Sequence, residues 1–143
     1  MNYMHLEIPA KTENEGFIRV VAAAFAARLD PTLEELNELK AAVSEAVMNC
    51  LLHAYEGVEG KISIKIRVEG KTLIMEIIDQ GRGIEDIAKA RTPLYTDKPE
   101  LERSGMGFTI MENFMDALSV DSKKGAGTTV IMRKTFGKTA DYN

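Results

Sequence analysis

The sequence is short of cysteine, of basic charge and of long apolar runs, and each shortage excludes a class of protein. Its single cysteine, Cys50, allows no internal disulfide and provides no cysteine cluster for zinc. A net charge of -4 argues against binding nucleic acid through a basic surface. No apolar run approaches the length of a membrane span, and residues 1–5 lack the basic and apolar regions of a signal peptide. We therefore expect a cytoplasmic protein that binds neither membranes nor nucleic acid directly.

The rest of the composition is that of an ordinary globular protein. The 143 residues are 45% apolar and 28% charged, which is enough to build one substantial hydrophobic core. We expect a single domain over residues 1–136, followed by a frayed tail at 137–143.

Alternation of apolar and polar residues indicates five strands. We expect these strands at 3–9, 61–68, 73–78, 117–122 and 128–133. Pro9 has no N–H to donate to a neighbouring strand, which favours an edge position for the first strand. The second and third strands are joined at Glu69-Gly70 and are expected to form an antiparallel hairpin.

The first expected helix runs from about Thr12 or Asn14 to Arg28. Its apolar residues recur at intervals of three and four, which predicts a buried stripe of Phe17, Val20, Val21, Ala24, Phe25 and Leu29. Arg19 lies off this stripe, and its own context indicates a solvated surface charge.

The second expected helix begins at Thr32, where Glu35 completes a capping box three residues later. Its predicted core stripe is Leu36, Leu39, Val43, Ala46, Val47 and Cys50. Glu45, Asn49 and His53 follow at intervals of four and form a polar column on another face. The column is either a hydrated helix face or a site where Asn49 ligates Mg²⁺ and Glu45 takes a proton from a hydroxyl. His53 fits a polar helix end as well as a ligand role.

The third expected strand ends in a motif with two glycines, Asp79-Gln-Gly-Arg-Gly83. Gly81 and Gly83 let the backbone turn and leave no Cβ between it and a flat ligand. Asp79 can accept a hydrogen bond from an exocyclic amine such as that of adenine. Taken alone, the motif more often marks a tight turn with a solvated aspartate, so the rest of the chain must decide.

A segment without periodicity, at about 87–104, is expected to be a lid because long irregular connections are usually functional or disordered. It leads into Ser104-Gly-Met-Gly-Phe108, where a helical pattern begins. Free amides at a helix start attract phosphate, as an alternative to a plain loop–helix junction. The candidate phosphate contacts are Gly105, Met106, Gly107 and Phe108.

Three further residues have an ordinary and a functional interpretation. Lys98 and Arg103 lie in the expected lid and are either solvated loop charges or contacts to a terminal phosphate. Thr128 begins the last strand, where β-propensity explains it and ligand contact is the alternative.

Four motifs follow one another over most of the chain: Glu-x-x-x-Asn, Asp-x-Gly-x-Gly, Gly-x-Gly and Gly-Thr. This order resembles the GHKL ATP-binding family, which includes gyrases and histidine kinases. The resemblance implies an α/β (α+β) two-layer sandwich, the Bergerat fold. Its sheet would be mixed and mostly antiparallel with helices on one face, and ATP would bind between the second helix and the lid.

Within that family the sequence is similar to the anti-sigma F serine kinases of sporulating Gram-positive bacteria. The most specific stretch is residues 99–116, and Ser44-Glu-Ala-Val-x-Asn49 and Leu29-Asp-Pro-Thr32 match as well. The resemblance implies ATP or ADP with Mg²⁺ as ligands. It also implies a homodimer that inhibits a sporulation sigma factor and phosphorylates a serine of an antagonist protein.

The resemblance also implies individual roles. Glu45 would be the general base, Asn49 the Mg²⁺ ligand and Asp79 the acceptor for the adenine amine. Gly81 and Gly83 would shape the pocket, Gly105, Met106 and Gly107 would cradle phosphates, and Thr128 would support the adenine side. Arg19 matches a first-helix arginine used for partner contact. The sequence departs from the family pattern at Met48, Ala54 and Asp97, which affects the shape expected at the phosphate end.

Two rival functions remain at this point. A binding module of the same fold would use ATP only as a switch, although the presence of Glu45 favours a kinase. A detached histidine-kinase domain needs a phosphoacceptor helical hairpin, which is not among the expected elements.

Overall fold

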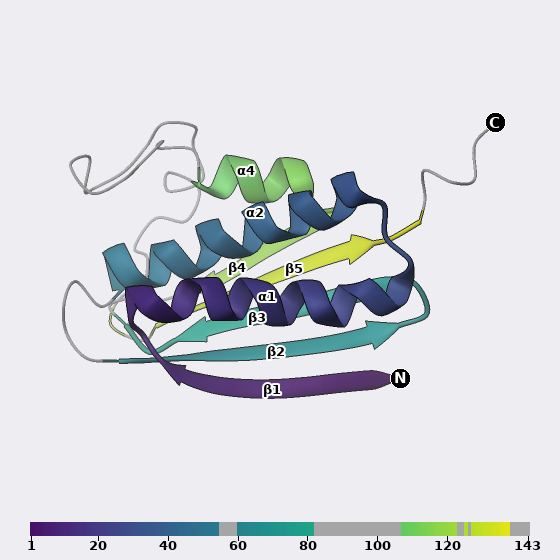
Figure 1. Ribbon diagram of the computed structural model, residues 1–143. Helices are drawn as coiled ribbons and strands as arrows, with labels where there is room; N and C mark the ends of the chain where they lie inside the picture. The colour runs from purple at the N-terminus through teal and green to yellow at the C-terminus, as the bar shows by residue number, and fades with distance from the viewer. Residues whose placement is uncertain (55–59, 82–106, 123–124, 126, 138–143) are drawn as a thin grey trace.

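The computed structural model describes residues 1–54, 60–81, 107–122, 125 and 127–137. In this part of the chain, a five-stranded sheet is covered by helices on one face (Figure 1). The strand order is β1-β2-β3-β5-β4, and each neighbouring pair is antiparallel. The predicted two-layer α+β fold is confirmed, and its mostly antiparallel sheet is antiparallel at every described strand pair.

The strands lie where alternation predicts them, with small shifts at their ends. They are β1 Asn2–Pro9, β2 Lys61–Glu69, β3 Thr72–Asp79, β4 Ala117–Ser122 and β5 Thr128–Thr135. β1 is an edge strand, as Pro9 indicates. Gly70 turns the β2–β3 hairpin with a positive φ of 60°. The register pairs Asp79 at the end of β3 with Thr128 at the start of β5.

Within the described residues, three α-helices form the second layer. They are α1 Glu15–Ala26, α2 Leu33–Asn49 and α4 Gly107–Phe114, and α2 packs between the other two (Figure 1). Single 3₁₀ turns flank α1, and a π-helical segment, Cys50–Ala54, continues from α2. None of the described helices is long and apolar enough to cross a membrane.

Helix α1 buries a different stripe from the predicted one. Its residues in the core are Ile18, Ala22 and Ala26, whereas Phe17 is 52% and Val20 is 62% exposed. Ala24 is exposed as well, and of the predicted stripe only Leu29, just after the helix, is fully buried. The prediction failed because α1 is apolar on most of its surface, so spacing alone does not select the buried side.

Helix α2 is the central element and behaves as its sequence predicts. The capping box is present: the Glu35 amide donates to Thr32 Oγ1 at 3.0 Å, and the Thr32 amide donates to Glu35 Oε1 at 2.9 Å. Its predicted stripe is buried except at Leu36, which packs partly buried against the same core. The C-terminal end of α2 is therefore part of a helix that is firmly packed against the core.

Candidate nucleotide site

The C-terminal end of α2 meets the end of β3 and the start of β5. Cys50, the residue that follows α2, lies within hydrogen-bonding distance of Asp79, the last residue of β3. Asp79 in turn pairs with Thr128, the first residue of β5. The fold thus brings together residues from three motifs that are far apart in the sequence.

Asp79 is buried, with only 5% of its surface exposed. Its Oδ1 accepts a hydrogen bond from the Gly81 amide at 2.9 Å, and its Oδ2 is 3.5 Å from the sulfur of Cys50. Burial raises the pKa of the Asp79 carboxyl, although the Gly81 amide, the Cys50 thiol and the Thr128 amide act in the opposite direction. This environment contradicts the alternative of a solvated turn aspartate.

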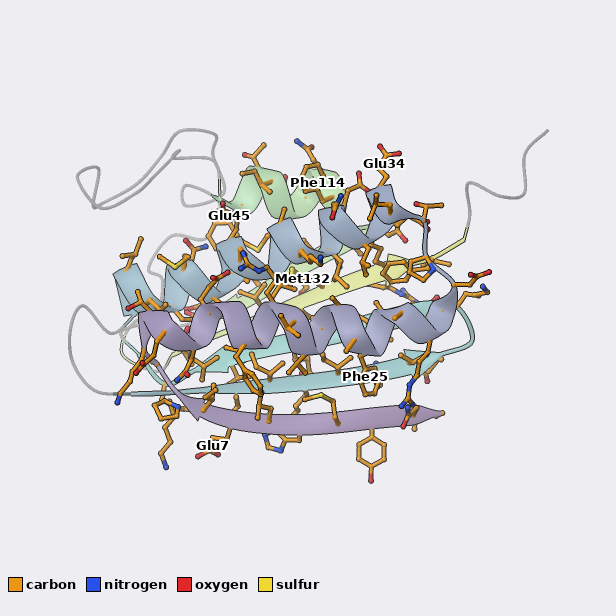
Figure 2. The ribbon with its side chains drawn as sticks, viewed as in Figure 1. Glu7, Phe25, Glu34, Glu45, Phe114 and Met132 are labelled. Carbon is orange, nitrogen blue, oxygen red and sulfur yellow. The ribbon has the colours of Figure 1, made fainter. Side chains whose placement is uncertain are left out.

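Asn49 and Glu45 lie one turn apart on α2. The side-chain nitrogen Nδ2 of Asn49 is buried and has no hydrogen-bond partner among the described residues. A buried amide without a partner costs free energy, and such groups in native proteins often await a ligand or ion. Glu45 is partly buried and projects from α2 on its α4 side (Figure 2). These two side chains thus offer a carboxylate and an amide at one end of the helix.

The α-helix ends at Asn49, and the backbone of His53 lies in the π-helical segment Cys50–Ala54. The His53 side chain lies outside the part of the chain that the structure describes, so the predicted polar column is described only at Glu45 and Asn49. Glu45 and Asn49 keep the predicted spacing, and the ligand role of His53 stays a prediction.

Gly127 belongs to this region, although the sequence did not single it out. Its φ is +84°, and a Cβ there would lie 2.2 Å from the carbonyl oxygen of Asp79. Only glycine therefore lets the start of β5 approach the end of β3 so closely. The Gly-Thr pair before the last strand was the available signal. Beside it, the Thr128 hydroxyl lies 2.7 Å from Ser122 Oγ, which also donates to the Gly127 carbonyl at 2.9 Å.

Arg19 is not the solvated charge that its sequence context indicates. Its Nη1 donates to Ser44 Oγ at 3.3 Å and lies 3.5 Å from Glu15 Oε1, and 43% of its side chain is exposed. The Ser44 hydroxyl also donates to Glu15 Oε1. Ser44 directly precedes Glu45, the candidate base. The exposed Arg19 on α1 is therefore joined by a hydrogen bond to the neighbour of Glu45 on α2.

The other candidate residues belong to the second half of the predicted site. Gly107 begins α4, and Phe108 packs partly buried against the core. The whole of the expected lid lies outside the described residues, and so do the remaining candidates: Gly83, Lys98, Arg103, Gly105 and Met106.

The sequence matches a known family over most of its length. Residues 8–134 match the family model described as Histidine kinase-like ATPase domain. A protein of Clostridium acetobutylicum named Anti-sigma F factor is 54% identical over 98% of this chain and 98% of its own. Proteins of the same name from Clostridium kluyveri and Bacillus subtilis are 55% and 54% identical, over 94% and 96% of this chain and 95% of theirs. The chain belongs to the anti-sigma F factor family.

A solved structure supports the same fold for this anti-sigma F family member. It is the crystal structure of the RsbU and RsbW domains of a Mycobacterium tuberculosis protein, and the TM-score is 0.68. The match covers 95% of this chain and 33% of that longer chain, at 16% sequence identity. At that identity the likeness concerns the fold alone.

The described residues fit the nucleotide and metal that an ATPase domain of the anti-sigma F family implies. Asp79 provides a buried carboxylate that can accept from an exocyclic amine. Asn49 provides a side-chain amide whose buried nitrogen has no partner in the described part of the chain, and its oxygen is the ligand type that Mg²⁺ takes. The site therefore has one group suited to the base and one suited to the metal-bound phosphates.

Proposed function

We propose that this protein is an ATP-dependent serine kinase that acts in the cytoplasm on a small antagonist protein and holds a sporulation sigma factor inactive. The observation that carries the proposal is the arrangement at the end of α2. There Glu45 and Asn49 lie one turn apart on α2, and Cys50, the residue after the helix, contacts the buried Asp79. Membership of the anti-sigma F factor family supports the same function.

In this proposal the chain contacts the base, the metal and the phosphates of the nucleotide complex. The Asp79 carboxylate accepts a hydrogen bond from the adenine amine, and Asn49 ligates Mg²⁺ through its amide oxygen. Bound ATP–Mg²⁺ supplies the transferable phosphoryl group and the charge that neutralises it. The remaining phosphate contacts come from Gly107 at the start of α4 and from the segment that precedes it.

Glu45 is the proposed general base. It accepts the proton of the antagonist's serine hydroxyl as the serine oxygen forms its bond to the γ-phosphorus. The bond between that phosphorus and the bridging oxygen breaks, and ADP leaves with the electron pair. The same helix that holds the metal ligand thus holds the base at a fixed distance from it, which is the positioning that phosphoryl transfer requires.

The proposed partner surface is the exposed side of α1 around Arg19. Phe17 and Val20 are exposed apolar residues on this helix. Arg19 lies between them in the sequence, and its side chain contacts Glu15 and Ser44. Arginine is one of the residue types enriched in binding hot spots. A homodimer is proposed as well, because the edge strand β1 offers backbone groups to a second copy.

Replacing Arg19 with alanine tests this surface. We expect Arg19→Ala to weaken binding of the sigma factor or the antagonist by about tenfold or more, with ATP affinity unchanged. The matched control is Arg28→Ala, since Arg28 lies near the far end of α1 and contacts the Phe25 ring at 5.9 Å. Partner affinity that survives Arg19→Ala would remove Arg19 from the partner surface.

A second candidate function is an ATP-switched binding module that transfers no phosphate. The contact between Arg19 and Ser44 favours it, because Ser44 directly precedes Glu45 and so joins the partner surface to the candidate base. The two candidates differ in one respect, which is whether a phosphate leaves ATP for the partner.

The deciding experiment mixes the protein with γ-radiolabelled ATP, Mg²⁺ and the antagonist from the same organism. The kinase proposal expects label on a serine of the antagonist and none with Glu45→Gln. Absence of label, with ATP binding demonstrated in the same preparation, would reject the kinase in favour of the switched module.

A further inference from the structure

The chain's single cysteine contacts the residue proposed to bind adenine. The sulfur of Cys50 lies 3.5 Å from Oδ2 of Asp79, and the two residues are 4% and 5% exposed. A carboxylate can only accept a hydrogen bond, so the thiol is the donor in this pair. From the sequence, Cys50 was expected only to fill the core stripe of α2, and this polar contact is additional to that packing.

The carboxylate is held from both sides. The Gly81 amide donates to Oδ1 at 2.9 Å, while the Cys50 thiol occupies Oδ2. Two donors on different oxygens fix the rotation of the carboxylate about the Cβ–Cγ bond. The Thr128 amide is a third donor, and the roughly four lone pairs of a carboxylate leave room for one further hydrogen bond. A fixed acceptor loses less conformational entropy on binding than a rotating one, so the two donors preorganise Asp79.

We propose that Cys50 is a positioning residue for base recognition, whose thiol orients the Asp79 carboxylate so that it selects a 6-aminopurine. The inference rests on the proposed nucleotide function and adds a specificity determinant to it. An oriented acceptor favours a base with an exocyclic amine. It opposes a 6-oxopurine, because the oxo oxygen would face a carboxylate that has no proton to give.

The position of Cys50 suits this role. It is the first residue of the π-helical segment, directly after Asn49, so it enters the site from the end of α2. A thiol behaves as a small apolar group with a weak donor and can be buried with a single polar partner. Cys50 thereby links the buried side of α2 to the proposed nucleotide site, and its thiol has a hydrogen-bond acceptor there in Asp79.

The test measures affinity for two nucleotides in the full-length protein with Mg²⁺. The first nucleotide is ATP and the second is purine riboside triphosphate, which lacks the exocyclic amine. Cys50→Ala and Cys50→Val remove the donor, and we expect each to weaken ATP binding about three- to tenfold. Affinity for the analogue should stay within about twofold, because the analogue makes no hydrogen bond to Asp79. Cys50→Ser keeps a donor and should restore most of the preference for ATP.

The matched control is Val47→Ala, a core substitution on the same helix. Val47 is fully buried and makes no hydrogen bond to Asp79, so its truncation should lower thermal stability without changing the ratio of the two affinities. A Cys50→Ala variant that loses affinity for both nucleotides equally would show that Cys50 only packs, and this would overturn the inference.

A second measurement does not depend on any variant folding. With one cysteine in the chain, the infrared spectrum contains one S–H stretching band, and we expect it at the lowered frequency of a donating thiol. A band at the frequency of a free thiol would overturn the inference. Failure of the unmodified protein to bind ATP would overturn the proposed function as well, whereas normal ATP binding with an unchanged ratio in the Cys50 variants overturns the inference alone.

Discussion

The two ends of helix α2 differ in how completely the buried polar and charged groups around them are paired. At the N-terminal end, Glu35 accepts hydrogen bonds from the Thr32 amide at 2.9 Å and from the Gly137 amide at 3.1 Å. Lys134 lies beside it and donates to the Phe114 carbonyl at 2.6 Å and to Glu38 at 3.2 Å. This end combines a capped helix start with a buried cation that has its own partners.

At the C-terminal end the pairing is incomplete. Among the residues that the structure describes, the buried side-chain nitrogen of Asn49 has no partner, and the donors to Asp79 are neutral: two amides and one thiol. The helix also changes there from α to π, a feature that is frequent at functional sites. The groups at this end are therefore available for a ligand, at a cost to stability.

Two carboxylates make the difference explicit, because Glu35 and Asp79 are each 5% exposed. Burial would raise the pKa of Glu35, but the Thr32 and Gly137 amides, the Thr32 hydroxyl and Lys134 lower it below its ordinary value. Burial raises the pKa of Asp79, and its neutral donors do not reverse the shift. A buried carboxylate whose hydrogen bonds outweigh its burial stabilises the fold, whereas one whose burial is not offset is typical of a functional site.

The largest effect is expected from Glu45→Gln at the C-terminal end. Loss of the proposed general base should slow phosphoryl transfer by about a hundredfold to ten-thousandfold while ATP affinity stays close to that of the unmodified protein. The measurement is single-turnover transfer from labelled ATP. Glu34→Gln, an exposed glutamate in the first turn of the same helix, is the control and should transfer normally. Equal transfer rates for the two variants would remove Glu45 from the chemistry.

The next effect is expected from Asp79→Asn, which is nearly isosteric. Replacing the buried acceptor should weaken ATP binding by about tenfold to a hundredfold, since hydrogen bonds to charged groups contribute about 1.5–3 kcal/mol. Calorimetric titration with ATP measures the effect. Asp121→Asn, on the exposed edge strand β4, is the control. Unchanged nucleotide affinity in Asp79→Asn would reject the adenine assignment.

A smaller effect is expected from replacing the glycines that precede β5, Gly125 and Gly127, with alanine. A Cβ at Gly127 would meet the Asp79 backbone at 2.2 Å, whereas a Cβ at Gly125 has open space around it. Both residues have positive φ, so the conformational cost is common to the two variants. Gly127→Ala should therefore lower the free energy of unfolding by about 1–3 kcal/mol more than Gly125→Ala, and it alone should weaken ATP binding. Urea unfolding would refute this if the two variants were equally stable.

The smallest effect is expected from Glu35→Gln at the N-terminal end of α2, and it concerns the pH dependence of stability. Because the folded-state pKa of Glu35 lies below the ordinary value of 4.5, its carboxylate stabilises the fold above that pH. The stabilisation is lost as pH falls through the folded-state pKa. Glu35→Gln should therefore lower stability at neutral pH and flatten its decline below pH 4.5, with ATP affinity unchanged. A parallel pH profile for variant and unmodified protein would contradict this.

Local sequence was enough to predict the strands, the capping box at Thr32 and the buried stripe of α2. In each case, the residues that decide the structure are near neighbours in the chain. Helix α1 was different because its apolar residues surround most of the helix, and packing against α2 selects Ala22 and Ala26 over Phe17 and Val20.

The candidate site was predictable in its residue types and not in its contacts. Glu45, Asn49 and Asp79 were identified from motifs whose chemistry suits a nucleotide. The contacts of Asp79 with Cys50 and Gly127 come from chain segments brought together by helix packing and strand register, so no local pattern indicates them. The same holds for Arg19, whose partner Ser44 lies on another helix.

The most direct measurement is a titration with ATP and Mg²⁺ followed through the backbone amide NMR signals. A ligand site at the C-terminal end of α2 predicts shift changes for the amides of residues 45–50, 79–81 and 127–128. The amides of residues 32–38 and 134–137, around the charged N-terminal end, should stay in place. Shifts confined to the N-terminal end, or no shifts at saturating ATP, would contradict the division of α2 into a stabilising end and a nucleotide-binding end.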